Sequence, residues 1–320
     1  MNITFDKINR LREFYSFGEI MGIFLKESVF YIKKYILKVE RIKTKVYEYD
    51  MIIPVQEEGI GKVLYTRGNR ELDHKYIMEE EIKSDDVILD LGANIGYYVL
   101  MECMLLKNSG KIYAIEPDSR NIDYLKENLT INPEYKNTSV EIIEGAISDF
   151  DGTAKFYLAD RTNLNTFNIS SDDNFREVDV KVYNFKTFIE DKGKIDLVRM
   201  DIEGHEVEVF NSLISLLTTN PELAPQKIVF ETHKSKYNDE HNMEKVLTEL
   251  FNLGYYPKVM TTANEKYSKF DELGYKPEFT IADFPFVRGI YKNISKPDAI
   301  KLVTDLGSVR TVLIEREQNA

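Results

Sequence analysis

The stretch VILDLGANIG, residues 87–96, is the most informative part of this 320-residue sequence. Its first five residues are apolar and partly β-branched apart from Asp90, which predicts a short buried strand of a parallel sheet. Gly92 and Gly96 follow, and glycine lets the backbone of a turn approach a ligand closely. The turn leads into an apolar helix predicted over residues 97–106, whose first N–H groups are free to bind an anion.

A second strand, predicted over residues 111–115, is followed directly by Glu116. The order strand, glycine turn, helix, strand and acid is typical of one half of a nucleoside-binding α/β fold. A dinucleotide site favours the spacing G-x-G-x-x-G, whereas Asn94 occupies the middle position here and Asp90 precedes the turn. An acid at this place repels a pyrophosphate and suits a cationic or zwitterionic ligand. S-adenosylmethionine is therefore favoured over NAD(P) as the ligand.

Composition agrees with a globular enzyme. Hydrophobic residues make up 43% of the chain, enough for one large α/β domain with an extension or for two domains. The net charge of −12 argues against a nucleic-acid partner, because such a partner requires a basic surface. Cys103 is the single cysteine, so we expect a buried thiol in a reducing, cytoplasmic compartment. We expect neither a signal peptide nor a membrane-spanning segment.

The N-terminal part of the chain is distinct in pattern. Residues 3–42 carry apolar side chains at helical spacing, and the basic stretch Lys33–Lys45 overlaps their end. Such helices more often cap a core or form a dimer face than lie on lipid, so membrane-surface contact is the minor expectation and a homo-oligomer is compatible with the sequence. Residues 46–55 and 62–66 are predicted to be two strands, arranged as a hairpin beside the main domain.

The rest of the chain alternates between strand and helix patterns. Helices are predicted at residues 69–83, 119–129, 206–217 and 241–253, and strands at 140–143, 153–158, 177–182, 195–200, 227–230, 255–260 and 311–314. The last two strands are expected to close the sheet as an antiparallel pair, with a loop-rich lid or substrate wall between them. The predicted fold is a Rossmann-like α/β sheet with helices on both faces. The chain divides into an N-terminal helical and β extension, residues 1–64, and a catalytic domain, residues 65–320.

A second group of reactive residues follows the strand predicted at 195–200. Asp201, Glu203 and His205 follow this strand, and Glu231 and His233 follow the next one. Because the carboxyl ends of parallel strands meet at one edge of a sheet, these side chains should converge beside the nucleoside site. Glu203 could instead cap the following helix, since acids favour the N-terminal end of a helix. Asp201, Glu203 and Glu231 could also hold a hard cation, but the spacing does not require one and we expect no metal.

Four motifs, in this order, resemble the FkbM family of S-adenosylmethionine-dependent methyltransferases. They are VILDLGANIG at 87–96, IEPD at 115–118 with Asn121, GAISDFDGTAKFY at 145–157 and IDLVRMDIEGHE at 195–206. The resemblance covers roughly residues 65–260, and its most specific element is the D-x-E-G-x-E sequence that begins at Asp201. It implies a class I methyltransferase fold and O-methylation of a hydroxyl on a sugar, a glycan or a polyketide-type natural product. His205 stands where members of this family commonly carry a small residue.

With S-adenosylmethionine as the donor, each predicted site residue takes a role. We expect the turn to hold the methionine end of the donor through Asp90, Gly92, Ala93, Asn94 and Gly96. Glu116 would bind the ribose, and the adenine would be flanked by Ala146, Ser148 and Asp149. The expected acceptor is a small molecule or a glycan. Glu231 and His233 would bind this acceptor, and the proton of its hydroxyl would pass to Asp201, Glu203 or His205. Two alternatives remain: an NAD(P)-dependent oxidoreductase, and a catalytically inactive donor-binding scaffold in glycan assembly.

Overall fold

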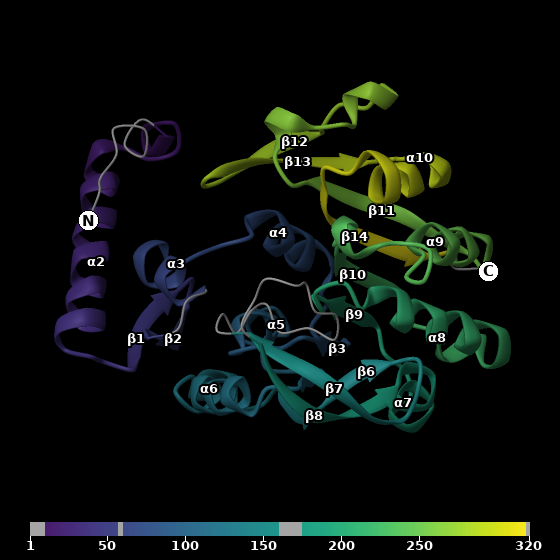
Figure 1. The fold of residues 1–320 in the computed structure, drawn as a ribbon, viewed down its shortest axis with the longest axis horizontal. Helices are drawn as coiled ribbons and strands as arrows, with labels where there is room; N and C mark the ends of the chain where they lie inside the picture. The colour runs from purple at the N-terminus through teal and green to yellow at the C-terminus, as the bar shows by residue number, and fades with distance from the viewer. Residues whose placement is uncertain (1–9, 57–59, 160–174, 318–320) are drawn as a thin grey trace.

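The computed structural model describes residues 10–56, 60–159 and 175–317, which are built around one central sheet (Figure 1). Nine strands of the described chain form this sheet in the order β12-β13-β11-β14-β10-β9-β3-β4-β5. The five strands at one side of the sheet are parallel: β5 (Ser139–Glu144), β4 (Lys111–Glu116), β3 (Val87–Leu91), β9 (Leu197–Met200) and β10 (Lys227–Glu231). All five were predicted, and β3 lies between β4 and β9, as a doubly wound sheet requires.

The other side of the sheet is antiparallel. β14 (Val309–Arg316) lies between β10 and β11 (Tyr255–Thr262) and runs antiparallel to both, which confirms the predicted closure of the sheet. The expectation of a loop-rich stretch between β11 and β14 was wrong, because this stretch contains β12 (Phe279–Asp283), β13 (Phe286–Lys292), α10 (Lys296–Lys301) and η8 (Leu302–Leu306). β13 pairs with β11, a contact between distant parts of the sequence that local pattern does not reveal.

Helices cover both faces of the sheet. Adjacent residues of a strand point to opposite faces, so the fully buried side chains of Ile88 and Leu89 belong to two separate hydrophobic clusters. The cluster of Leu89 includes residues of α7 (Phe185–Lys192), α8 (Glu206–Thr219) and α9 (Met243–Asn252). The cluster of Ile88 includes residues of α4 (Leu72–Glu81), α5 (Tyr97–Leu105) and α6 (Ser119–Thr130). The predicted Rossmann-like fold with helices on both faces is therefore confirmed.

The N-terminal elements differ in detail from the prediction. α2 (Phe17–Tyr31) and the short π-helix η1 (Ile32–Ile36) precede a hairpin of β1 (Arg41–Val46) and β2 (Tyr49–Pro54). The strand predicted at 62–66 is instead part of the helix α3 (Ile60–Arg67), so the predicted domain boundary at residue 64 falls inside a helix. A Cβ atom on Gly61 would lie 2.4 Å from the carbonyl oxygen of Pro54, so α3 packs directly against the end of the hairpin.

A small second sheet extends from the carboxyl edge of the main sheet. It contains β6 (Ala146–Ser148), β8 (Phe175–Asn184) and β7 (Gly152–Ala159), in that order. The extra strands predicted at 153–158 and 177–182 correspond to β7 and β8. Residues 160–174, between β7 and β8, lie outside the described part of the chain. β6 follows β5 directly, which brings Ala146 to the same edge as the end of β4.

Candidate active site

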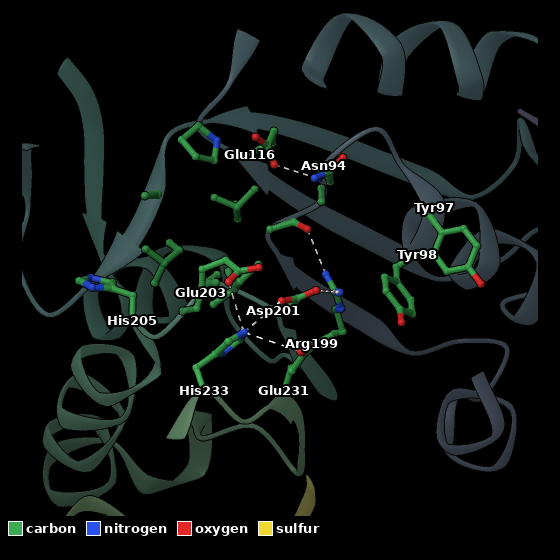
Figure 2. Close-up of a pocket in the computed structure, with 18 of the residues that line it drawn as sticks. Asn94, Tyr97, Tyr98, Glu116, Arg199, Asp201, Glu203, His205, Glu231 and His233 are labelled. Atoms are coloured by element: carbon green, nitrogen blue, oxygen red, sulfur yellow. Dashed lines mark hydrogen bonds and ion pairs between the residues drawn. The ribbon is translucent and has the colours of Figure 1, made fainter. Parts of the chain in front are cut away.

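The carboxyl ends of β3, β4, β9 and β10 open into a pocket of about 390 Å³ (Figure 2). Open α/β sheets bind ligands at this edge, and the volume is in the range of small-molecule sites. Ten residues predicted for the site line the pocket: Gly92, Ala93, Asn94, Glu116, Ala146, Asp201, Glu203, His205, Glu231 and His233. Four predicted residues do not line it: Asp90, Gly96, Ser148 and Asp149.

The turn after β3 requires glycine at its first position. Gly92 has a φ of +85°, and a Cβ atom there would lie 2.2 Å from the carbonyl oxygen of Asp201. The N–H groups of Gly92 and Ala93 both donate to the carbonyl oxygen of Ile115, at 3.1 and 3.0 Å. The turn is thus held between the exit of β9 on one side and β4 on the other.

The second glycine of the turn has a different role. Gly96 has a φ of +88° and caps the N-terminal end of α5. A Cβ atom there would lie 2.6 Å from Cδ1 of Leu125, so the glycine allows α6 to approach the start of α5. Gly96 therefore shapes the turn from behind and does not face the pocket.

Glu116, at the end of β4, is buried and already accepts three hydrogen bonds. The N–H of Asn94 donates to it at 2.8 Å, the N–H of Asp118 at 2.9 Å and the side-chain amide of Asn121 at 3.1 Å. Burial raises the pKa of Glu116 to about 7 despite these hydrogen bonds. Because an ionised carboxylate has about four acceptor positions, one remains for a ligand. Glu116 therefore positions the turn as well as facing the pocket.

A buried arginine connects two of the predicted acids. Nη1 of Arg199 donates to the Asp90 carboxylate at 3.1 Å and to the Gly92 carbonyl oxygen at 3.0 Å, while Nη2 donates to Asp201 at 3.1 Å. The guanidinium also lies over the ring of Tyr98, 3.9 Å from its centroid. Asp90 is fully buried, so it acts on the turn through Arg199 and not by contact with the pocket. Arg199 was not singled out from the sequence, although a cation inside a buried strand is itself a signal of a paired charge.

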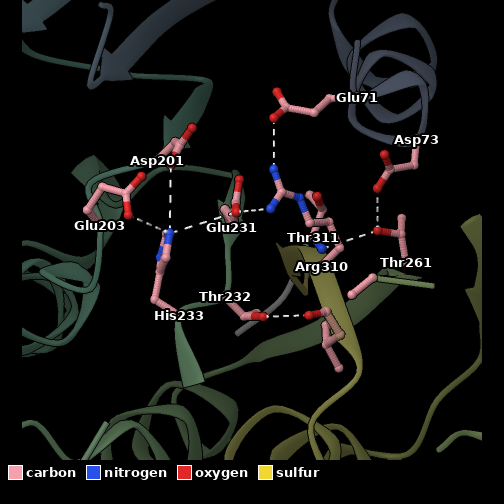
Figure 3. A network of polar contacts seen from close by, with 12 residues as sticks. Glu71, Asp73, Asp201, Glu203, Glu231, Thr232, His233, Thr261, Arg310 and Thr311 are labelled. Carbon is pink, nitrogen blue, oxygen red and sulfur yellow. Dashed lines mark hydrogen bonds and ion pairs between the residues drawn. The ribbon is translucent and has the colours of Figure 1, made fainter. Parts of the chain in front are cut away.

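Three acids surround the ring of His233 (Figure 3). Its Nε2 atom lies 4.0 Å from a carboxylate oxygen of Asp201, 3.6 Å from one of Glu203 and 3.8 Å from one of Glu231. Its Nδ1 atom lies 3.0 Å from Oε1 of Glu206, a fully buried residue at the start of α8. Burial alone would favour the neutral ring, but the acids raise the pKa of His233 to about 10. At neutral pH the ring is a cation that donates toward carboxylates on both sides.

Asp201 and Glu203 differ in their charge state. Burial disfavours ionised Asp201, but the charges of Arg199 and His233 outweigh this and hold its pKa below the ordinary value. Burial and the charge of Asp201 raise the pKa of Glu203 to about 7. Glu203 lies in the left-handed region with a φ of +53°, and its side chain contacts His233, while His205 takes the N-cap position of α8. This arrangement favours a chemical role for Glu203 over the capping role.

The charge network extends to residues that the sequence analysis missed (Figure 3). Arg310, near the start of β14, forms ion pairs with Glu231 and with Glu71, the latter at 2.8 Å. Glu71 also pairs with Arg70 and accepts a hydrogen bond of 2.6 Å from the hydroxyl of Tyr98. All of these residues line the pocket. This side of the pocket is therefore a mixed network of arginines and carboxylates.

His205 lies apart from the ring of His233 (Figure 2). Its Nε2 atom is 2.9 Å from the hydroxyl oxygen of Ser148, and its Nδ1 atom is 3.3 Å from a carboxylate oxygen of Glu208. Burial lowers the pKa of His205. The hydroxyl of Ser148 is thus engaged with His205, and the neighbouring Asp149 is exposed outside the pocket. Of the residues predicted to flank adenine, only Ala146 lines the pocket.

A divalent cation would find a set of ligand atoms in the acid cluster. Three residues, Asp201, Glu203 and His233, each offer one ligand atom, and these three atoms lie within 4.8 Å of one another. The set considered from the sequence contained Glu231 in place of His233, but Glu231 is paired with Arg310. A metal requires a neutral imidazole, whereas the surrounding acids hold the His233 ring protonated. The expected absence of a metal stays a prediction.

Comparison with known proteins identifies the family. A model described as the methyltransferase FkbM domain matches residues 90–257. The chain is 30% identical to the uncharacterized protein MJ1452 of Methanocaldococcus jannaschii over 181 residues, which cover 51% of this chain and 68% of that protein. It is 25% identical to the hexuronic acid methyltransferase AglP of Haloferax volcanii over 194 residues, which cover 60% of this chain and 73% of that protein.

A solved structure of a putative transferase, PH0793 from Pyrococcus horikoshii, is similar with a TM-score of 0.40 and 13% identity, covering 91% of this chain and 84% of that one. Because the family model spans more than half of the sequence, the chain belongs to the FkbM methyltransferase family. Methyltransferases of this family use S-adenosylmethionine, so the predicted donor is confirmed. The oxidoreductase alternative is not supported.

Proposed function

We propose that this chain transfers the methyl group of S-adenosylmethionine to a hydroxyl oxygen of a sugar, a glycan or a related natural product. The observation that carries the proposal is a single pocket with two different sides. One side has the turn at Gly92–Asn94 and the carboxyl of Glu116, and the other has Asp201, Glu203 and His233. The first side suits a nucleoside with a zwitterionic tail, and the second suits a hydroxyl that loses a proton.

The donor side would bind S-adenosylmethionine through backbone and one acid. The close backbone approach at the turn suits the methionine end, and the remaining acceptor position of Glu116 suits a ribose hydroxyl. Ala146, with the neighbouring Ile147 and Phe156, supplies an apolar surface for the adenine. Asp90 and Gly96 contribute by fixing the turn.

The chemical step would be a direct displacement. A lone pair of the acceptor oxygen forms the new O–CH₃ bond as the S–CH₃ bond breaks, and S-adenosylhomocysteine leaves with the electron pair on sulfur. The acceptor proton passes to the carboxylate of Glu203, whose pKa of about 7 suits a base that works near neutral pH. His233, held protonated by Glu206, stabilises the neighbouring carboxylates and cannot itself take the proton at this pH.

The acceptor class is inferred from the network and from one relative. AglP is named a hexuronic acid methyltransferase, and Arg70 and Arg310 line the pocket of this chain. Both arginines already pair with acids, so a bound carboxylate would share them with Glu71 and Glu231. A sugar that carries both hydroxyls and a carboxylate is accordingly the first acceptor to test.

The test is turnover with defined sugars. The protein is incubated with S-adenosylmethionine and either uronic acids or matched neutral sugars, and S-adenosylhomocysteine and the methylated sugar are measured by mass spectrometry. The proposal expects an alkali-stable methyl ether. An alkali-labile methyl ester would move the reaction to a carboxylate and remove the need for a base. Donor binding with no turnover on any sugar would favour the inactive-scaffold alternative.

A further inference from the structure

Large apolar side chains are exposed along one N-terminal surface. Eleven such side chains are exposed in the described part of the chain, and seven of them lie between residues 17 and 37. We call these seven the outer stripe: Phe17, Met21, Leu25, Ile32, Tyr35, Ile36 and Leu37, with exposed fractions between 47% and 72%. Soluble surfaces rarely gather so many apolar side chains, and such a patch marks an interaction site.

The outer stripe is opposite the face by which α2 is attached. Phe17, Met21 and Leu25 are spaced four residues apart, so they follow one side of the helix. The buried side chains Ile20, Ile23 and Phe30 are on the other side, where Phe30 packs with α3 and Ile20 and Ile23 form a small cluster with Leu11. The sequence favoured a core-capping role or a dimer face for these helices, and the inner face is the one that packs against the rest of the chain. α2 itself lies at one edge of the molecule (Figure 1), and the outer stripe on it stays exposed.

The inner face is fixed to the rest of the protein by specific contacts. Oε1 of the buried Glu27 lies 3.1 Å from Nζ of Lys62 in α3. The ring of Phe30 packs against that of Tyr65 in the same helix, with centroids 5.6 Å apart. A helix held in this way cannot turn its outer stripe inward without breaking the ion pair between Glu27 and Lys62.

Unpaired positive charges accompany the outer stripe. Lys26 follows Leu25 in the sequence, Lys33 and Lys34 lie between Ile32 and Tyr35, and Lys38 follows Leu37. None of these four lysines forms an ion pair within the residues that the structure describes. Nζ of Lys34 lies over the ring of Tyr35 in the outer stripe, 5.7 Å from its centroid, whereas Nζ of Lys33 lies over the ring of Tyr65 in α3, 5.5 Å from its centroid. By contrast, Arg41 pairs with Glu127, and Lys43 and Lys45 pair with Asp50. The lysines are a local positive patch on a chain whose net charge is −12.

We propose that the outer stripe and its lysines bind the surface of an anionic lipid membrane. An amphipathic helix with apolar residues on one face and lysines at the border inserts its apolar face at the headgroup level, while lysine stems extend toward the charged headgroups. The orientation is parallel to the membrane, because none of the helices among the described residues has the length and apolar character to span one. This inference does not depend on the identity of the methyl acceptor.

The charges argue against a second copy of the chain as the occupant. A symmetric dimer through the outer stripe would bring Lys26, Lys33, Lys34 and Lys38 of each copy toward the same lysines of the other. Like charges placed close together at an interface disfavour association, whereas anionic headgroups neutralise them. Acidic residues elsewhere on the chain would be repelled by the same anionic membrane, so the outer stripe is the surface that would face it.

The binding surface lies one helix away from the pocket. α3 packs against α2 through its outer side and contributes Ile60 to the pocket lining. Membrane binding through the outer stripe would therefore hold the pocket close to the lipid surface. The function of the N-terminal extension would then be to attach the methyltransferase domain to the membrane.

The experiment is flotation of the full chain with vesicles of phosphatidylcholine, made with or without phosphatidylglycerol. We expect binding only when phosphatidylglycerol is present. Leu25→Gln and Ile36→Gln should each weaken it about tenfold, because each removes an inserted side chain. Both positions are exposed and glutamine is a good helix former, so the melting temperature should not change. Tyr267→Gln, at an equally exposed aromatic outside the stripe, is the matched control and should bind as the wild type does.

A second variant tests the charge. Replacing Lys26, Lys34 and Lys38 together by glutamine should weaken binding to anionic vesicles on the order of 100-fold, since each of the three lysines contributes a similar factor to the affinity for such a surface. The matched control replaces three exposed, unpaired lysines elsewhere: Lys126, Lys136 and Lys276.

Three results would overturn the proposal. The first is no binding to either vesicle, and the second is equal binding to both. The third is a wild-type dimer in light scattering that Leu25→Gln converts to a monomer, which would assign the surface to self-association. Donor binding measured on the same variants keeps this test separate from the proposed methyl transfer.

Discussion

Glu203→Gln separates the chemical role of Glu203 from its structural role. Glutamine has nearly the same shape but cannot accept a proton from the acceptor. If Glu203 is the base, turnover should fall by about 10²–10⁴-fold while donor affinity stays nearly normal. The wild-type rate should rise with pH and level off above pH 7, because Glu203 accepts a proton only when ionised and its pKa is about 7. That rise should be absent from the variant.

The same substitution should increase stability at high pH. The pKa of Glu203 increases from 4.5 to about 7 in the folded chain, which corresponds to about 3 kcal/mol against the ionised form. Below pH 4.5 both folded and unfolded chains hold the proton, so the penalty is absent. It grows as the pH rises toward 7 and is complete above it, because only the unfolded chain ionises freely in that range. Glutamine avoids the penalty, so the variant should gain up to about 3 kcal/mol at pH 8 and little at pH 4.

The assays are S-adenosylhomocysteine release with the acceptor found by screening, and thermal unfolding of both proteins at pH 4 and pH 8. Glu144→Gln is the control, because Glu144 is an exposed acid at the end of β5, on the same sheet edge. It should change neither rate nor stability. A Glu203→Gln variant that keeps the wild-type rate, or that loses stability at pH 8, would refute the reasoning. The helix-capping hypothesis predicts that second result, by a fraction of a kcal/mol.

Four further predictions concern ligands. S-adenosylhomocysteine should raise the melting temperature and NAD(H) should not, because only a ligand that binds the folded state stabilises it; a shift with NAD(H) alone would contradict the assigned donor. Gly92→Val should abolish this shift, since a Cβ there meets the Asp201 carbonyl oxygen at 2.2 Å, and retained affinity would place the donor elsewhere. Glu116→Ala should weaken donor binding in calorimetry by about 1.5–3 kcal/mol, and unchanged affinity would remove Glu116 from the site. A chelator should leave wild-type turnover unchanged, because His233 is protonated at neutral pH; loss of activity that a divalent cation restores would show a metal site.

The parallel half of the fold could be predicted because its signals are local. Residues 87–116 contain an uninterrupted strand, a glycine turn, a helix and a second strand, and each pattern is readable within about ten residues. The failures are elements whose state depends on distant contacts. A short apolar run such as 62–66 fits a strand or a helix, and its packing on the β1–β2 hairpin selects the helix. β12 and β13 form because β11 offers an edge to pair with.

The residues of the candidate site divide in the same way, into those whose place follows from local sequence patterns and those whose place depends on distant contacts. Asp201, Glu203, Glu231 and His233 were predicted to converge because they all follow parallel strands, and this topology follows from the order of the elements. Arg310 was missed although a signal existed. β14 was expected to be antiparallel, which brings its first residues to the carboxyl edge, and Thr311 is indeed opposite Glu231. Glu71, before α4, had no such signal, since its place depends on how α4 packs.

We infer from the electrostatics of the pocket which of the three predicted candidates would act as the base. Arg199 holds Asp201 in its ionised form and lowers its pKa. Asp201 would therefore not retain a proton taken from the acceptor near neutral pH. His205 lies beside Ser148 and Glu208, apart from the cluster, and burial lowers its pKa. Of these three candidates, Glu203 has a pKa of about 7 and a partly exposed side chain in the pocket, next to a cation that stabilises its ionised form. Glu203 can therefore change its charge during the reaction, which is the property that a general base needs.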